Sequence, residues 1–168
     1  MIAILENMQS DEDYVRRCIE LASQSQQGGD LPFGAILSSP KFGDFEAKNT
    51  GLKDITGHAE INAIKQALDA RPEIEFKDCT LYSNFEPCAM CSFVVRDVGI
   101  GRVVFAVESP HLGGHSKWDI LSNDKLRPEF TSKHQASVPK VTSGLLKAEA
   151  QKVFDQLNWK MHKSDDFS

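Results

Sequence analysis

The stretch LYSNFEPCAMCSFVVRDVGIGRVVFAV, residues 81–107, decides the fold, because it changes from strand to helix and back to strand. Alternating residues over 79–85 predict a strand, and a run rich in β-branched residues over 102–107 predicts another. Residues 88–98 between them are typical of a helix, with Phe93 as a core candidate. The stretch therefore predicts a strand–helix–strand unit in which a Cys-x-x-Cys pair begins the helix.

The residues before this unit predict two more helices and one strand. Helical spacing of apolar residues over 11–27 predicts a first helix, for which Asp11 is the candidate N-cap. The short apolar run 33–37 predicts a buried strand. Residues 58–72 predict a second helix, capped by Thr56.

After the unit, the chain predicts a long loop, a strand and a terminal helix. Residues 108–137 predict the loop, in which 118–122 is the one candidate for a short helix. Residues 138–142 predict the strand, and amphipathic spacing over 145–161 predicts the helix. We expect the tail, 160–168, to be frayed. This order of elements predicts a three-layer α/β fold.

Composition excludes several classes of protein. The 168 residues are 40% hydrophobic and 26% charged, which fits one globular domain over 1–168 that needs no disulfides to fold. The 19 lysines and arginines against 24 acidic residues give a net charge of −5, which argues against a broad phosphate-binding surface. No signal peptide and no apolar run of about 18 residues is visible. We therefore expect a cytoplasmic protein with no membrane partner, whose four cysteines serve metal binding or catalysis.

The residues His58, Cys88 and Cys91 form a candidate zinc set, with Glu60 two positions after the histidine. A Cys-x-x-Cys pair at a helix start brings both sulfurs near one point, and the helix N-terminus favours the thiolate. Two thiolates and a neutral imidazole leave the fourth tetrahedral position open, as catalytic zinc requires. A water there ionises with a pKa of roughly 7, and Glu60 is placed to take its proton without ligating the metal. The pattern predicts one zinc ion per chain.

Two other interpretations of the cysteine pair are weaker. A redox dithiol leaves the neighbouring His-Ala-Glu sequence unexplained. A structural zinc site needs a fourth protein ligand, and the nearest sulfur, Cys79, lies at the far end of the predicted strand. We expect Cys18 and Cys79 to be small buried apolar residues.

The two motifs together, His58-Ala59-Glu60 and Pro87-Cys88-Ala89-Met90-Cys91, form the signature of zinc-dependent deaminases. On these residues the chain resembles the cytidine deaminase-like superfamily of zinc hydrolases. The similarity extends through PFGAIL (32–37), HAEINAI (58–64) and GRVVFAV (101–107). It is closest to the branch that holds tRNA adenosine deaminases, bacterial guanine deaminases and fungal-type cytosine deaminases. The resemblance implies an α/β/α sandwich around a five-stranded mixed sheet, and a homodimer in which the partner helps to close the active site.

The resemblance also implies residues that contact the substrate. Phe33 and its neighbours supply a pocket wall, Ala59 offers its backbone N–H, and Asn49 matches the asparagine that binds the base. Phe85 either stacks on the ring or is a core aromatic residue.

The loop 110–119 is unlike that of the tRNA branch. Asp119 falls about where guanine deaminases place an acidic residue that reads the purine, and Trp118 is then placed to stack on the ring. The alternative is that Asp119 only caps a helix after the loop.

The implied reaction is hydrolytic deamination of a heteroaromatic ring, by zinc-hydroxide attack with Glu60 as the proton shuttle and with release of ammonia. Our leading hypothesis is a deaminase of a free nucleobase, nucleoside or related aminoheterocycle in purine metabolism, with guanine as the first candidate. The alternative is a tRNA-specific adenosine deaminase, which converts adenosine to inosine. A third hypothesis is a non-catalytic zinc-binding relative, against which the intact Glu60 argues.

Overall fold

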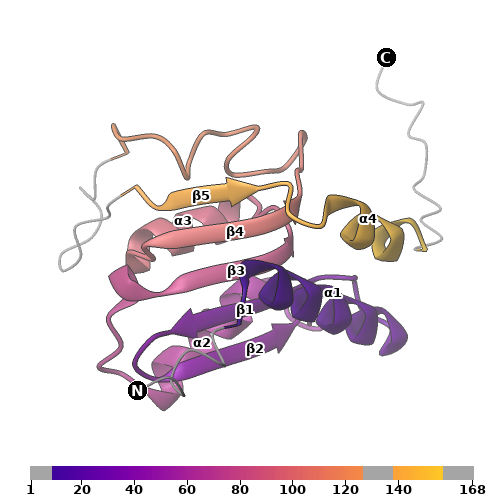
Figure 1. Cartoon of the computed structure of the whole chain (residues 1–168), viewed down its shortest axis with the longest axis horizontal. Coiled ribbons are helices and arrows are strands. Elements are labelled where there is room, and N and C mark those ends of the chain that lie inside the picture. The colour runs from indigo at the N-terminus through magenta and orange to yellow at the C-terminus, as the bar shows by residue number, and fades with distance from the viewer. Residues whose placement is uncertain (1–8, 127–137, 157–168) are drawn as a thin grey trace, which may run out of the picture.

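The computed structural model describes residues 9–126 and 138–156 (Figure 1). Its helices and strands follow the order that the sequence predicts, with one strand added between the first strand and the second helix. They are α1 (Asp11–Gln27), β1 (Gly34–Ser39), β2 (Gly43–Lys48), α2 (Ala59–Ala70), the 3₁₀ turn η1 (Phe76–Asp78), β3 (Thr80–Phe85), α3 (Ala89–Val98), β4 (Arg102–Val107), β5 (Lys140–Ser143) and α4 (Lys147–Asp155).

The strands form one mixed five-stranded sheet in the order β2-β1-β3-β4-β5. β1 is antiparallel to both β2 and β3, whereas β3, β4 and β5 run parallel. The predicted strand–helix–strand unit is therefore β3-α3-β4, a parallel pair joined by a crossover helix. The register pairs Thr80 with Arg102 and Phe85 with Val107.

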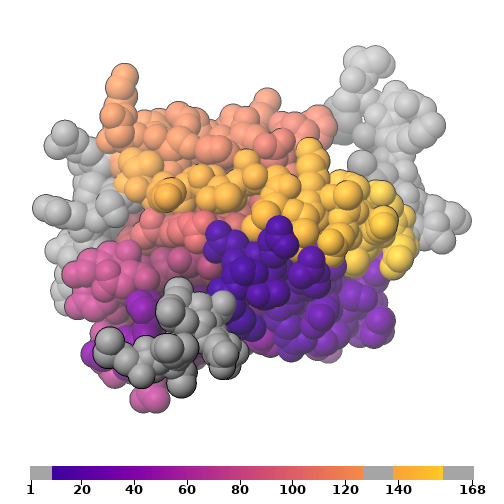
Figure 2. All heavy atoms as spheres, in the orientation of Figure 1, coloured from indigo at the N-terminus to yellow at the C-terminus, as the bar shows by residue number. Residues whose placement is uncertain are grey.

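Helices cover both faces of the sheet, so the predicted three-layer fold is confirmed. α1 and α4 lie side by side on one face (Figures 1 and 2). α2 and α3 lie on the other (Figure 1). Successive strand residues point to opposite faces. Leu81 and Val103 accordingly pack with α2 and α3, whereas Tyr82 and Val104 pack with α1 and α4. Among the described residues, no helix is long and apolar enough to span a membrane.

α1 and α2 have different N-cap residues from those that the sequence predicts. Ser10, not Asp11, caps α1, because its hydroxyl accepts from the Asp13 amide while the Asp13 carboxylate accepts from the Ser10 amide. α2 begins at Ala59 with His58 as N-cap, so the predicted cap by Thr56 is wrong. The Thr56 hydroxyl instead donates to Asp54.

Two other segments also differ from the expectation, and a third extends beyond the described residues. The edge strand β2 was not expected, because only one of its residues is buried and no clean alternation marks it. Residues 118–122 form turns rather than a helix. α4 ends at Asp155, and the remainder of the predicted helix and the tail 160–168 lie outside the described residues.

Candidate metal centre and active site

The three predicted metal ligands lie at the beginnings of two helices that cover the same face of the sheet. His58 is the N-cap of α2, and Cys88 is the N-cap of α3, with Cys91 in the first turn of that helix. Neither N-cap side chain makes a capping hydrogen bond, so both remain directed to other partners. The positive ends of the two helix dipoles favour anionic thiolates at this point.

The distances between the ligand atoms fit a tetrahedral zinc ion. Cys88 Sγ lies 3.5 Å from His58 Nδ1 and 3.6 Å from Cys91 Sγ, and Cys91 Sγ lies 3.4 Å from His58 Nδ1. Zinc bonds of about 2.3 Å to sulfur and 2.0 Å to nitrogen imply tetrahedral edges of about 3.8 Å and 3.5 Å. The three atoms therefore form one face of a tetrahedron, which leaves the fourth position for water or substrate.

The acid–base properties of the two cysteines also favour a cation. The hydrogen bond between the two cysteine sulfurs lowers the pKa of Cys88 to about 4. The same hydrogen bond and burial raise the pKa of the Cys91 thiol. Two thiolates beside a buried carboxylate are strongly unfavourable unless a positive ion shares the site, so the donor set suits zinc.

Glu60 lies next to the ligands without belonging to them. It is in the first turn of α2, only 5% exposed, and its Oε2 lies 3.7 Å from Cys91 Sγ. Its other oxygen accepts a hydrogen bond of 3.4 Å from the Ser83 hydroxyl. Burial raises the pKa of Glu60, which brings it nearer to the value that a general acid–base requires.

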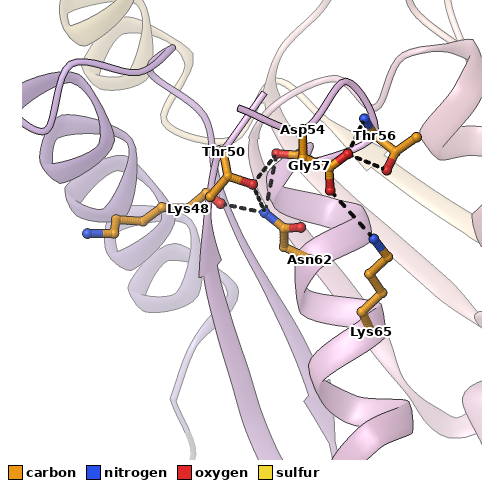
Figure 3. A network of polar contacts seen from close by, with 7 residues as sticks. All are labelled: Lys48, Thr50, Asp54, Thr56, Gly57, Asn62 and Lys65. Atoms are coloured by element: carbon orange, nitrogen blue, oxygen red, sulfur yellow. Dashed lines mark hydrogen bonds and ion pairs between the residues drawn. The ribbon is translucent and has the colours of Figure 1, made fainter. Parts of the chain in front are cut away.

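The loop that leads to His58 is held closed by Asn62 of α2 (Figure 3). The Asn62 amide nitrogen donates to the Lys48 carbonyl, the Thr50 hydroxyl and the Gly57 carbonyl at 3.0 to 3.2 Å. The Thr50 amide also donates to the Gly57 carbonyl at 2.7 Å. These bonds hold the end of β2 and Thr50 against Gly57, the residue that directly precedes His58.

Asn49, the predicted base-binding residue, is buried and oriented by Asp30. Its Nδ2 donates to Asp30 Oδ1 at 2.7 Å, and its backbone amide donates to the Phe33 carbonyl. Burial alone would raise the pKa of Asp30, but hydrogen bonds from Asn49 and Leu31 lower it, so this carboxylate can only accept. The orientation leaves Asn49 Oδ1 without a hydrogen-bond partner among the described residues.

Phe33 and Phe85 belong to a cluster of three aromatic rings. Their ring centroids lie 5.5 Å apart, edge to face, and Phe154 of α4 stacks on Phe85 at 5.0 Å. Asn84 holds Phe33 in place, since its side chain accepts from the Gly34 amide and donates to the Pro32 carbonyl. The backbone around Phe33 is thus joined to β3, the strand that leads to the cysteines.

Of the other residues predicted to contact the substrate, one is buried and two are exposed. Ala59 is fully buried as the first residue of α2. Trp118 is 55% exposed, and Asp119 is exposed with a positive φ of 52°. Their segment reaches the metal site through the backbone, because the Trp118 amide donates to the Gly113 carbonyl and Gly113 pairs with Cys88.

The structure also places residues that the sequence did not single out. Glu86, 3% exposed, directly precedes Pro87-Cys88, and its carboxylate accepts hydrogen bonds from the loop that contains Trp118 and Asp119. Asp30 and Ser83 contact Asn49 and Glu60. An acidic residue beside a metal motif was the only signal for Glu86, and its partners lie more than 20 positions away.

Known proteins share this arrangement. The family model described as the zinc-binding region of cytidine and deoxycytidylate deaminases matches residues 8–107. A tRNA-specific adenosine deaminase of Bacillus subtilis is 33% identical over 146 residues, which cover 84% of each chain. A probable cytosine deaminase of Schizosaccharomyces pombe is 33% identical over 111 residues, 64% of this chain and 66% of that protein.

Two solved structures are similar in fold and sequence. A tRNA:A34 deaminase superimposes with a TM-score of 0.71 and 26% identity, over 83% of this chain and 97% of the other. Guanine deaminase of Bacillus subtilis superimposes with a TM-score of 0.55 and 31% identity, over 60% of this chain and 66% of the other. The match of the family model across the metal ligands, together with their geometry, shows that the chain belongs to the cytidine and deoxycytidylate deaminase family and is a zinc-dependent hydrolytic deaminase.

Proposed function

We propose that the protein deaminates a small, free aminated heterocycle, and that guanine is the first substrate to test. The observation that carries the substrate class is the charge of the chain, which is −5 overall. Around the exposed loop beside the metal site, Lys117 and Lys125 are balanced by Asp119 and Asp124. A protein that binds RNA through phosphate contacts needs an excess of positive charge at such a surface.

Glu60 carries the proton in this reaction. The oxygen of water bonds to the ring carbon, the bond from that carbon to the amino nitrogen breaks, and ammonia leaves. Glu60 takes one proton from the water and gives it to the ring nitrogen. It then takes the second proton from the hydroxyl now bonded to the ring carbon and gives it to the departing amino group. A zinc ion held by His58, Cys88 and Cys91 supplies the Lewis acidity that makes water nucleophilic near neutral pH.

Five other groups are proposed to recognise the ring. Asn49 presents Oδ1, an acceptor without a protein partner among the described residues, which suits a ring N–H. Phe33 forms part of an aromatic wall, and the backbone of Ala59 supplies a donor at the beginning of α2. Trp118 stacks on the ring and Asp119 accepts a second ring N–H, which favours guanine over a smaller pyrimidine.

A tRNA-specific adenosine deaminase is the second candidate. Relatives of that name align over most of the chain, 75% for the Aquifex aeolicus protein and 84% for the Bacillus subtilis protein. Binding of an anticodon stem-loop would then depend on surface lysines such as Lys117 and Lys125, and would weaken steeply with salt.

We also propose that the protein is a homodimer and acts in a reducing compartment such as the cytoplasm. Large apolar side chains are exposed on the segments around the metal site, and a second copy of the chain would cover them. They are Leu52, Ile55, Phe93, Leu112 and Trp118. All four cysteines are free thiols, which suits metal ligation under reducing conditions.

The deciding experiment measures ammonia release from guanine, cytosine, adenine, pterins, their nucleosides and an anticodon stem-loop. We expect turnover of guanine that is insensitive to salt and absent in the zinc-chelated protein. Deamination of the stem-loop and of no free base would establish the second candidate instead. The affinity for the stem-loop should then fall by about 10³-fold or more between 50 and 200 mM salt.

A further inference from the structure

Glu86 is a buried carboxylate that the reaction does not use. It stands between the end of β3 and Pro87-Cys88, it is 3% exposed, and it is absent from the set of possible metal ligands. Burying a charged group is unfavourable unless hydrogen bonds compensate it. The groups that compensate Glu86 therefore indicate what the carboxylate holds in place.

Within the described part of the chain, every hydrogen bond that the Glu86 carboxylate accepts comes from residues 108–126 after β4, which we call the 108–126 loop. Oε1 accepts from the backbone amides of His115 and Ser116 at 2.9 and 2.7 Å. Oε2 accepts from the Ser109 amide at 2.6 Å and from the Ser116 hydroxyl at 2.7 Å. Four donors thus converge on one carboxylate, and such charge-assisted bonds are about twice as strong as neutral ones.

The loop approaches the metal-binding turn so closely that two glycines are required. Gly113 pairs with Cys88, and the Gly114 amide donates to the Pro87 carbonyl at 2.9 Å. A Cβ on Gly113 would overlap the Glu86 carboxylate, and one on Gly114 would overlap the Ser92 side chain. The 108–126 loop is therefore packed directly against the residues that lead to Cys88.

A buried arginine holds the other end of the same loop. Arg96 lies on α3, the helix that carries Cys91, and its guanidinium donates to the carbonyls of Ile120, Asn123 and Leu126 at 2.6 to 2.9 Å. The loop is therefore attached to the metal-binding segment at two places, by amides at Glu86 and by carbonyls at Arg96. Trp118 and Asp119 lie between these two attachments.

We infer that Glu86 is a positioning residue for substrate recognition: it holds the 108–126 loop against the metal-binding turn and thereby places Trp118 and Asp119 relative to the ring being deaminated. This inference rests on the proposed function, because Trp118 and Asp119 are its substrate contacts. Among the described residues, the Glu86 carboxylate accepts its hydrogen bonds from Ser109, His115 and Ser116 and makes none to the metal ligands or to Glu60. Its loss should therefore weaken substrate binding more than it slows the chemical step.

The test is Glu86→Gln. Glutamine has the same shape as glutamate, but its amide nitrogen is a donor and would face the Ser109 and Ser116 donors where the carboxylate oxygen accepts from them. We expect zinc content to stay at one ion per chain and hydrogen exchange at the Ser109, His115 and Ser116 amides to increase. Losing hydrogen bonds to a charged group should raise KM by roughly 10- to 100-fold, with kcat within about 3-fold of the parent. The matched control is Glu108→Gln, an exposed carboxylate of the same loop that pairs with Lys147 at the surface, and it should change none of these.

Ser116→Ala provides a second variant that removes one donor from an exposed position and leaves the fold intact. It should show the same increases in KM and in hydrogen exchange as Glu86→Gln, but smaller ones. Loss of zinc from Glu86→Gln, a reduced kcat with unchanged KM, or unchanged exchange in both variants would overturn the inference. If no free base is deaminated, the proposed function fails by itself; KM is then measured on whichever substrate the ammonia screen identifies, and the exchange measurement still tests the role of Glu86.

Discussion

The chemistry of the site depends on side chains in the first turns of two helices. Each metal ligand occupies a position where the backbone amides of a helix beginning are unpaired and the helix dipole is positive. Glu60 is on the same turn as His58, yet it remains outside the ligand set. At this scale, the residues proposed to bind zinc and the residue proposed to move protons can be tested separately.

Replacing Cys88 with Ala should remove the metal. Two ligands cannot complete a catalytic zinc site, and the thiolate also joins the beginning of α3 to that of α2. Zinc measured by atomic absorption should fall from about one ion per chain to near zero. The control is Cys79→Ala, a buried thiol outside the site, which should retain its zinc. Full zinc occupancy in Cys88→Ala would show that the ligand set is wrong.

Glu60→Gln should keep both the zinc and the fold, since the side chain is buried, is not a ligand and is replaced by one of the same shape. The rate should fall by about 10²- to 10⁴-fold, as is typical when a general acid–base is lost. Steady-state kcat on the identified substrate provides the measurement, with Glu75→Gln, an exposed carboxylate, as control. Activity near that of the parent would place the proton transfer on another group.

Asp119→Ala tests whether the purine is read at this position. A ring N–H left unpaired in a desolvated pocket costs about 1–3 kcal/mol, or roughly 5- to 150-fold in kcat/KM. The loss should be large for guanine and small for cytosine. Equal losses for both bases would remove the reason to prefer guanine.

At the scale of secondary-structure elements, charged side chains join α1 to the sheet. Asp11 accepts from Arg102 of β4 at 2.8 Å and from the hydroxyl of Tyr82 of β3 at 2.9 Å. The hydrogen bond from Arg102 is the main reason that the pKa of Asp11 lies below its ordinary value of 3.8. A lowered pKa in the folded state stabilises the protein above the unfolded pKa, and this stabilisation is lost as the pH falls through the folded pKa.

Asp11→Asn should therefore reduce the free energy of unfolding at pH 7, and its difference from the parent should shrink below about pH 4. Urea unfolding at a series of pH values measures this difference. The control is Asp69→Asn, a carboxylate on the exposed face of α2, which should leave the free energy of unfolding at pH 7 unchanged. A difference that stayed constant down to about pH 2 would contradict the assignment.

At the scale of the whole molecule, the two faces of the sheet have different roles. α2 and α3 carry the metal ligands on one face, and α1 and α4 cover the other (Figure 1). Exposed apolar side chains lie on α3 and on the loops before α2 and after β4, with Phe93 of α3 53% exposed. The proposed homodimer would use this side of the molecule.

Phe93→Asp should convert the dimer to a monomer, because a charge buried without a partner at an interface is unfavourable. Sedimentation velocity should show a single smaller species, with Lys152→Asp on α4 as a control that leaves the dimer unchanged. A parent protein that sediments as a monomer at all concentrations would contradict the proposed dimer.

The sequence by itself predicted the metal chemistry, because the candidate ligands and Glu60 occur within two short motifs, His58-Ala59-Glu60 and Pro87-Cys88-Ala89-Met90-Cys91. It also determined the alternation of helices and strands, since apolar periodicity depends on neighbouring residues. Phe93 shows the limit of that reasoning. Its apolar character predicted a core position, but the phase of α3 leaves it exposed while Val95 is buried.

Only the tertiary structure decided which distant groups meet. β2 became a strand because β1 lies beside it, in spite of a sequence with little alternation. Asp30 orients Asn49 across 19 positions, and Glu86 holds amides 23 to 30 positions away. The physical reason is that a hydrogen bond or a buried charge is compensated by whatever the fold brings within about 3 Å, and no local spacing in the sequence encodes that neighbour.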